Sequence, residues 1–455
     1  MAADSFKITL AQLNPTVGDI AGNAAKARAA RAKATADGAE LVVLPELFLT
    51  GGLAQQQAEV PPACRAAIET LARETSDGGP ALLIGTPWSE DGKLYNACVL
   101  LDGGRVAATR FKINLSGDQK RLFTRGPAAG PLSVRGVRVG IAIGEDIWPE
   151  QPGHENVVET LAETGAELIV VPAAARYVRG DGDRRLSAAV ARVTESDLPL
   201  IWLNQTGGQG GDVFDGASFA LNADLSMAVQ LPAFVDDLTT LAWSRGSDGW
   251  QCRGGPVSSL IDGDEADYAA LVLGLRDRVA KAGFNGVVLG LTADARSALS
   301  LALAVDALGP ARVRGVVLSG PDSVAQDAAI AAAARLGVAA EVVPIAAAVA
   351  GFESILAEKL SHDAHRDLLA SVRATLLRAL ASLSGGLALA PRRESNWHGD
   401  EVGRNVLLAD DIPPAHLIRL AALRNRWQPV DALGVSGEVI PPDFIDRASR
   451  DADEG

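Results

Sequence analysis

The sequence predicts an α/β fold in two successive domains. Its 455 residues exceed what one ordinary hydrophobic core accommodates. Short apolar, β-branched runs alternate with helical stretches, as in sheets that helices cover on both faces. A polar, glycine-rich stretch, residues 244–259 (SRGSDGWQCRGGPVSS), separates two such series. We therefore expect a first domain over residues 1–245, a linker over 246–263, a second domain over 264–447 and a charged tail over 448–455.

The most informative stretch of the first domain is VRVGIAIGEDIW, residues 137–148. It predicts a buried strand over 137–143 that ends in a turn with two carboxylates, Glu145 and Asp146. A strand-to-helix turn is where α/β enzymes present a nucleophile, yet the residue before these carboxylates is Gly144. The other expected strands are 6–13, 40–44, 81–85, 94–101, 105–112, 168–172 and 198–204, and the expected helices are 23–37, 62–74, 154–164 and 184–196.

In the second domain the order of strand, helix and strand predicts a parallel, right-handed unit. The expected strands are 287–291, 313–318 and 338–343, and the expected helices are 264–282, 297–308, 324–336, 364–383 and 414–424.

The charge balance excludes some classes of partner. The chain has 42 basic and 56 acidic residues and a net charge of −14, which argues against binding to nucleic acid or to an anionic membrane. The N-terminus has no signal-peptide pattern, and no apolar run is long enough to span a bilayer. We expect a cytoplasmic protein.

Cysteine and histidine usage gives no sign of a disulfide framework or a metal centre. Cys64, Cys98 and Cys252 lie far apart, which suits a reducing compartment. The five histidines form no metal-binding pair of known spacing, and His362 and His365 lie in a solvated segment. The sequence therefore predicts no metal site.

Four segments of the first domain resemble the nitrilase superfamily, and specifically the glutaminase domain of glutamine-dependent NAD+ synthetases. They are PELFLTGG at 45–52, RFK at 110–112, GIAIGEDIW at 140–148 and GGQGGDVFDGASF at 207–219. The resemblance implies an αββα sandwich, with Glu46 as the general base and Lys112 stabilising the oxyanion. It also places Glu145 at the site, and Gly144 where the family has its cysteine nucleophile.

The departures from this pattern predict a loss of glutaminase activity. A nitrilase forms a thioester through a cysteine thiolate, and Gly144 has no side chain to attack the amide carbon. The segment after Lys112 is shorter than its family counterpart, and Gly210-Gly211 replace an acidic pair, so we expect a misshapen pocket. Glu46 and Lys112 would then remain as a buried ion pair, because the loss of one partner would leave the other charge unpaired.

Residues 287–309 (VVLGLTADARSALSLALAVDALG) resemble the nucleotide-binding start of the NAD+ synthetase domain. This resemblance implies a Rossmann-like, doubly wound parallel sheet and an ATP-binding loop at Thr292, Ala293, Asp294, Arg296 and Ser297. In the family this loop has glycines and backbone N–H groups that surround the pyrophosphate. Here Ala293 and Asp294 replace both glycines, Arg296 replaces an aspartate, and only the hydroxyls of Thr292 and Ser297 remain.

Taken together, these features favour a pseudoenzyme derived from a glutamine-dependent NAD+ synthetase, with a regulatory, structural or ligand-sensing role. The alternative is an active NAD+ synthase that amidates deamido-NAD+ with glutamine and ATP, or an altered amidase or ligase activity in one domain. No cofactor is expected unless the synthetase domain is active, in which case it would use ATP and Mg2+. The resemblance also implies a homo-oligomer, or a hetero-oligomer with an intact NAD+ synthetase.

Overall fold

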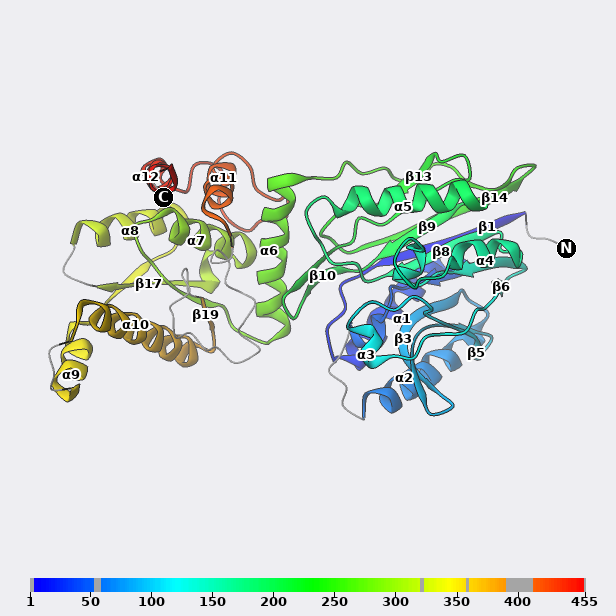
Figure 1. The fold of residues 1–455 in the computed structure, drawn as a ribbon, viewed down its shortest axis with the longest axis horizontal. Helices are drawn as coiled ribbons and strands as arrows, with labels where there is room; N and C mark the ends of the chain where they lie inside the picture. The colour runs from blue at the N-terminus through cyan, green and yellow to red at the C-terminus, as the bar shows by residue number, and fades with distance from the viewer. Residues whose placement is uncertain (1–3, 53–58, 320–322, 357–359, 390–411, 454–455) are drawn as a thin grey trace. The chain divides into compact units, whose positions relative to one another are not determined.

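The chain folds into two compact units, Met1–Ile261 and Asp262–Gly455, each of the α/β class that the sequence predicts (Figure 1). The computed structural model describes residues 4–52, 59–319, 323–356, 360–389 and 412–453.

Within the described residues, the first unit contains two large sheets and a small hairpin, β10–β11. The first sheet has the order β15-β14-β1-β2-β3-β4-β5, and the second has the order β13-β12-β9-β8-β7-β6. The strands of the first sheet are β1 Ser5–Gln12, β2 Leu41–Val43, β3 Ala81–Glu90, β4 Lys93–Asp102, β5 Arg105–Phe111, β14 Asp237–Gly246 and β15 Gly249–Cys252. The remaining strands are β6 Leu132–Val134, β7 Val137–Ile141, β8 Leu168–Ala173, β9 Leu200–Asn204, β10 Thr206–Gln209, β11 Asp212–Asp215, β12 Phe219–Leu221 and β13 Met227–Gln230.

The two sheets pack face to face, and helices cover their outer faces. One core lies between the sheets. It contains alternate residues of β1 (Phe6, Ile8 and Leu10) together with Val139 and Ile201 of the second sheet. A second core lies under α1 Ile20–Ala36 and α2 Val60–Glu74, and a third lies under α4 Val157–Glu163 and α5 Asp181–Ser196 (Figure 1). The predicted αββα sandwich is therefore confirmed.

Helix α1 shows how the local sequence specifies these layers. Asp19 caps the helix, because its Oδ1 accepts a hydrogen bond of 2.8 Å from the Gly22 N–H. Four alanines at helical spacing, Ala24, Ala27, Ala30 and Ala34, are buried against the sheet. The small side chains let the helix backbone lie close to β1 and β2.

Part of the predicted linker 246–263 is a strand instead. Residues 249–252 form β15, which pairs antiparallel with β14. Trp250 and Cys252 are each 2% exposed and alternate with the less buried Gly249 and Gln251, so they complete the core between the sheets. The prediction of a linker relied on composition, and the many glycines and polar residues of residues 244–259 outweighed the alternation of this short strand.

The second unit is built on a parallel sheet of order β18-β17-β16-β19 in the described residues. Its strands are β16 Val287–Gly290, β17 Val313–Ser319, β18 Ala340–Pro344 and β19 Leu387–Leu389. Its helices are α6 Gly263–Lys281, α7 Ala295–Leu308, α8 Ser323–Arg335, α9 Ala346–Leu356, α10 His362–Ser384, α11 Pro414–Arg424 and α12 Pro442–Asp453.

Helices cover both faces of this sheet, as the predicted doubly wound fold requires. Leu289 of β16 packs in a core with Leu299 of α7 and Leu420 of α11, whereas its neighbour Val288 packs with Leu377 of α10 on the other face. Most of the predicted charged tail, residues 448–455, is helical, because α12 continues to Asp453. Phe444 in this helix is buried, which holds it on the domain core.

A buried polar cluster joins three helices of the second unit. The Arg424 guanidinium in α11 donates from Nε to Asp306 Oδ2 at 2.6 Å and from Nη2 to Asp306 Oδ1 at 2.9 Å. The Tyr268 hydroxyl in α6 donates to the same carboxylate at 2.7 Å. Asp306 is fully buried, so its charge depends on these donors.

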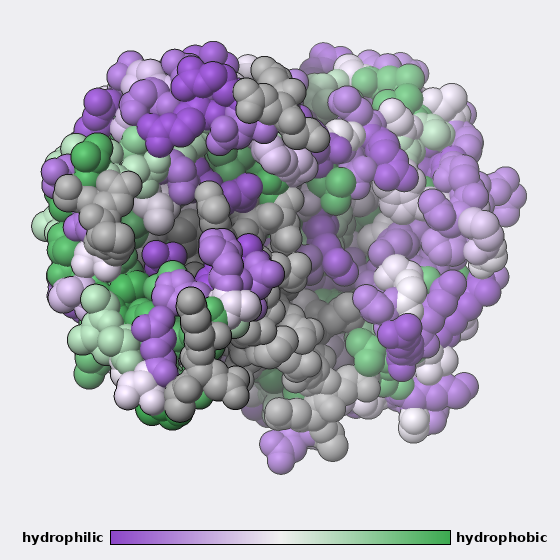
Figure 2. All heavy atoms as spheres, turned by 60° about the vertical axis from the view of Figure 1, so that its left-hand side comes forward, coloured by the Kyte–Doolittle hydropathy of each residue, from purple (hydrophilic) through white to green (hydrophobic). Residues whose placement is uncertain are grey.

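The surface agrees with the composition of the chain. In Figure 2, purple hydrophilic residues cover much of the face shown, with smaller areas of green hydrophobic residues between them. Among the described helices, none is both long enough and apolar enough to cross a bilayer.

We predict that Asp306→Ala lowers the free energy of unfolding by about 3–5 kcal/mol, because it leaves the Arg424 charge unpaired in the core. The control is Asp431→Ala, which removes a partly exposed partner of Arg276 and should cost less than about 1 kcal/mol. Urea denaturation of both variants measures the difference. Equal losses would show that the buried cluster contributes no more than a surface ion pair.

Candidate functional site

Glu46 and Lys112 form a buried ion pair at the ends of two strands. Glu46 follows β2 and Lys112 follows β5, and Lys112 Nζ lies 2.6 Å from Glu46 Oε1. The lysine is fully buried and the glutamate is 2% exposed. The structure thus brings together the predicted base and the predicted lysine, which are 66 residues apart in the sequence.

Three further donors hold the Glu46 carboxylate, and the sequence analysis did not identify them. Asn96 Nδ2 and Gln119 Nε2 donate to Oε1 at 2.7 and 3.1 Å, and the Ala174 N–H donates to Oε2 at 3.2 Å. Asn96 is a buried amide within the apolar strand β4, a local signal that could have pointed to this role. Gln119 lies in the short helix α3, Gln119–Leu122, where nothing local distinguishes it.

Glu145 is the second carboxylate partner of Lys112, whose Nζ donates to Glu145 Oε2. Burial lowers the pKa of Lys112, but the charges of Glu46 and Glu145 outweigh it and raise the pKa above its ordinary value. Burial acts on Glu145 in the opposite sense, yet the Lys112 ammonium holds the pKa of this carboxyl below its usual range. The lysine therefore stays charged between two carboxylates.

Gly144 begins the turn that ends the β7 region, η3 Gly144–Ile147, in a left-handed conformation with φ of +50°. A Cβ atom built on this residue would lie 2.5 Å from Glu46 Oε2 and 2.9 Å from Lys112 Nζ. A side chain here would therefore point directly at the ion pair. This is the geometry expected of a nucleophile position, at a residue that has no side chain.

The buried Asp146 side chain holds the turn at Gly144–Ile147 through hydrogen bonds to the backbone. Its carboxylate accepts backbone N–H bonds from Ile113 (3.1 Å), Asn114 (2.7 Å) and Ile143 (2.9 Å). Burial raises the pKa of Asp146 to about 7, although these three donors favour the charged form. Asp146 thereby links the segment after Lys112 to the turn at Gly144.

A cavity of about 500 Å³ opens beside this cluster. Its lining residues include Glu46, Gly144 and Glu145, and also Leu115, Ser116 and Gly117 from the segment after Lys112. Arg184 and Trp148 also line it, and the guanidinium lies 5.9 Å from the centre of the indole ring. A pocket is therefore present beside Glu46 and Gly144.

The expectation about Gly210-Gly211 differs from the structure. These residues form the turn between β10 and β11, and they are not among the described residues that line the cavity. The next residue, Asp212, pairs with the lining residue Arg176 at 3.3 Å.

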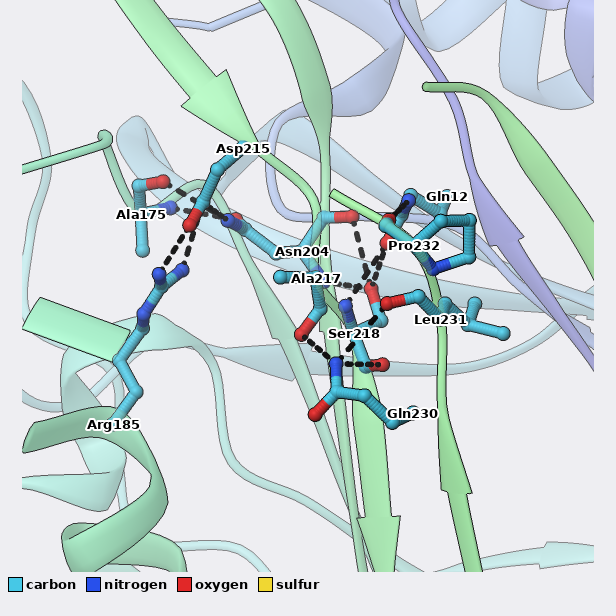
Figure 3. A network of polar contacts seen from close by, with 10 residues as sticks. All are labelled: Gln12, Ala175, Arg185, Asn204, Asp215, Ala217, Ser218, Gln230, Leu231 and Pro232. Atoms are coloured by element: carbon cyan, nitrogen blue, oxygen red, sulfur yellow. Dashed lines mark hydrogen bonds and ion pairs between the residues drawn. The ribbon is translucent and has the colours of Figure 1, made fainter. Parts of the chain in front are cut away.

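A polar network supports the wall of the cavity formed by residues 173–176 (Figure 3). The Asn204 side chain accepts from the Ala175 N–H at 2.8 Å and donates to the Ala175 carbonyl at 3.0 Å. It also donates to Asp215 Oδ1 at 3.1 Å, and Asp215 accepts from Arg185 of α5 at 2.9 Å. Ala174, the donor to Glu46, therefore lies in a segment whose backbone is fixed on both sides.

The same network connects the two sheets. The Asn204 N–H donates to Ser218 Oγ at 3.0 Å, and Ser218 Oγ lies 2.8 Å from Gln12 Oε1 at the end of β1 (Figure 3). Gln230 donates to the carbonyls of Ala217, Ser218 and Leu231. The buried polar groups of this region thus support one arrangement of the two sheets.

In the second unit, Asp294 occupies the N-terminus of α7. Its Oδ1 accepts from the Ser297 N–H at 2.9 Å, and its Oδ2 accepts from the Thr292 hydroxyl at 2.8 Å. Ser297 Oγ accepts from the Thr292 N–H at 3.0 Å. A carboxylate of the chain itself therefore binds where a helix N-terminus would bind an external anion.

The other predicted loop residues lie nearby but have different surroundings. The Ala293 carbonyl accepts a weak bond from Arg447 of α12 at 3.4 Å. Arg296 has a buried Nη1 without a hydrogen-bond partner in the part of the chain that the structure describes. The loop keeps the strand-to-helix topology of a phosphate site, but the donors of Thr292 and Ser297 are already in use.

Cys98 is a core residue of the first unit. It is fully buried in β4, and burial raises its pKa well above the ordinary value. It therefore lacks the exposure and the thiolate character of a nucleophile.

Comparison with known proteins agrees with this architecture. Residues 7–247 match the carbon-nitrogen hydrolase family and residues 267–397 match the NAD synthase family. The glutamine-dependent NAD+ synthetase of Rhodobacter capsulatus is 38% identical over 98% of this chain and 83% of its own length. That of Synechocystis sp. is 32% identical over 97% of this chain and 83% of its own.

A solved structure extends the likeness to three dimensions. The glutamine-dependent NAD+ synthetase of Acinetobacter baumannii, in complex with ADP, superposes with a TM-score of 0.86 at 28% identity, over 97% of this chain and 85% of that one. Both the order of the two domains and the fold of each are shared. The chain belongs to the glutamine-dependent NAD+ synthetase family.

Proposed function

We propose that this chain is a family member that binds a small ligand in its first domain without hydrolysing it, and that it has a regulatory, structural or sensing role. The observation that carries the proposal is the geometry at residue 144. A Cβ atom on residue 144 would point into the Glu46–Lys112 pair, but Gly144 has no side-chain atom there. Thioester formation requires a thiolate at this point.

Direct attack by water is a poor substitute for the missing thiol. Glu46 Oε1 already accepts three hydrogen bonds, so a proton from water would have to pass to Oε2. A water molecule also lacks the covalent attachment that holds a nucleophile in attack geometry. These features support binding over turnover in the cavity.

The second domain supports the same proposal independently. The Asp294 carboxylate caps α7, and a phosphate approaching it would meet a like charge. Two unit charges 4 Å apart interact by about 4 kcal/mol at an effective dielectric constant near 20. A repulsion of that size opposes the binding of ATP phosphates at the N-terminus of α7.

The second candidate is the family reaction itself, ATP-dependent amidation of deamido-NAD+ with glutamine. The names of the relatives favour it, as do the intact ion pair and the open cavity. Under this alternative, ammonia would reach the second domain without the thioester route.

One assay separates the two candidates. The purified chain is incubated with deamido-NAD+, ATP and Mg2+, with either glutamine or ammonium chloride, and glutamate, AMP and NAD+ are measured. We expect none of the products above background, and the Rhodobacter capsulatus enzyme serves as the positive control. NAD+ formed from ammonium alone would show an active second domain, and NAD+ formed from glutamine would refute the whole proposal.

Gly144→Cys is predicted to restore no more than trace glutamate release. The new Cβ must displace Glu46 or Lys112, and Glu46 is held by four donors. A non-glycine residue at φ of +50° adds a strain of about 1–2 kcal/mol. Mass spectrometry after mixing with glutamine detects a glutamyl thioester, and Gly144→Ala is the control. Rapid turnover through a thioester would show that one missing atom was the only defect.

We predict that ATP–Mg binds weakly or not at all, and that Asp294→Gly tightens binding at least tenfold by removing the like charge. The same change should cost about 0.5–2 kcal/mol in stability, because it removes the cap of α7. Asp262→Gly is the matched control, since Asp262 precedes α6 without a side-chain cap. Calorimetric titration measures the affinity, and micromolar binding by the unmodified chain would contradict the prediction.

A further inference from the structure

The sequence contains one Asn–Gly dipeptide, Asn285–Gly286, and the structure places it at the surface of the second unit. The dipeptide joins α6 to β16, and Asn285 is exposed. A pocket of about 220 Å³ is lined by both residues, and also by Arg312, Ser384 and Gly386. Water therefore reaches the Asn285 side chain.

The reactivity of an asparagine amide depends on the residue that follows it. The backbone nitrogen of that residue can attack the asparagine Cγ and close a five-membered succinimide ring. A side chain on the following residue crowds this approach, most of all when it is β-branched, whereas glycine has no side chain and a mobile backbone. The Gly286 N–H donates to no acceptor among the described residues. Neither a side chain nor a hydrogen bond therefore restrains the attacking nitrogen.

The contacts of the Asn285 amide leave its carbonyl carbon open to this attack. Asn285 Nδ2 donates to the Ser384 carbonyl at 3.0 Å, at the end of α10, and Oδ1 accepts no hydrogen bond from the part of the chain that the structure describes. The bond engages the amide nitrogen, which is the leaving group, and not the carbon. Because the side chain is held, we expect ring closure to be slower than in the unfolded chain, but not blocked.

We propose that Asn285 is a site of spontaneous deamidation through a succinimide. The Gly286 nitrogen loses its proton to water and forms a bond to Asn285 Cγ, and the side-chain nitrogen leaves as ammonia. Water then adds to one of the two ring carbonyls, which gives aspartate or isoaspartate at position 285. Water is the only co-reactant, and the proposal does not depend on the function proposed for either family site.

The isoaspartyl product changes the main chain between two hydrogen bonds. The Asn285 N–H donates to the Gly385 carbonyl at 2.9 Å, and the Gly286 carbonyl accepts from the Leu387 N–H at 2.9 Å. Both bonds attach the dipeptide to the segment that begins β19, the parallel neighbour of β16. An isoaspartyl linkage inserts one more main-chain carbon between these two points. It should therefore loosen the attachment of β19 to the sheet.

The test is to incubate the folded, full-length protein in mildly alkaline buffer and to digest it with trypsin. The peptide of residues 282–296 contains Asn285 as its single asparagine. We expect its conversion from amide to acid, measured by mass spectrometry, to be at least tenfold faster than that of Asn156. Asn156 is the internal control, because it is partly exposed but precedes the β-branched Val157. A protein isoaspartate methyltransferase with a labelled methyl donor measures the isoaspartate formed.

Asn285→Gln is the matched variant, since it keeps an amide but its longer side chain cannot close the five-membered ring. After the same incubation it should gain no label at this position and should unfold at a higher temperature than the incubated unmodified protein. Thermal unfolding before incubation verifies that the variant folds. Conversion at Asn285 that is no faster than at Asn156, or label that persists in Asn285→Gln, would overturn the proposal. Equal unfolding temperatures after full conversion would refute the loosening of β19.

Discussion

The buried ion pair of Glu46 and Lys112 is the constraint on which the first domain depends. A fully buried ammonium group requires compensating charge and hydrogen bonds, and removal of one partner of such a pair typically costs about 3–5 kcal/mol. Asn96, Gln119 and the backbone at Ala174 satisfy the Glu46 carboxylate, so strand ends from both sheets converge on it. This requirement holds whether or not a nucleophile stands beside the pair.

The two candidate sites differ in their charged groups. At residue 144 a side chain is missing beside a preserved electrostatic cluster, and at residue 294 a carboxylate is present where an incoming anion would need vacant donors. In both places a carboxylate, Glu46 or Asp294, accepts hydrogen bonds from donors of its own domain.

The fold could be predicted because its signals are local, and three members of the first site could be predicted from the family resemblance of the motifs around them. Short β-branched runs indicate the buried strands. Short motifs at strand ends contain Glu46, Lys112 and Gly144. Gln119 could not be found in this way, since its role depends on a contact with a residue 73 positions away. Strand β15 was missed because its two buried residues lie among glycines and polar residues, where composition outweighs alternation.

The Asp294 cap has a consequence for how the protein responds to its surroundings. A phosphate-binding loop normally obtains its anion from solution, so the order of its helix rises and falls with nucleotide concentration. Here the anion is the Asp294 carboxylate, which is covalently part of the chain. Its effective concentration at the α7 N-terminus depends on the backbone and not on the nucleotide concentration of the cell. The α7 N-terminus therefore has a carboxylate beside it at every nucleotide concentration.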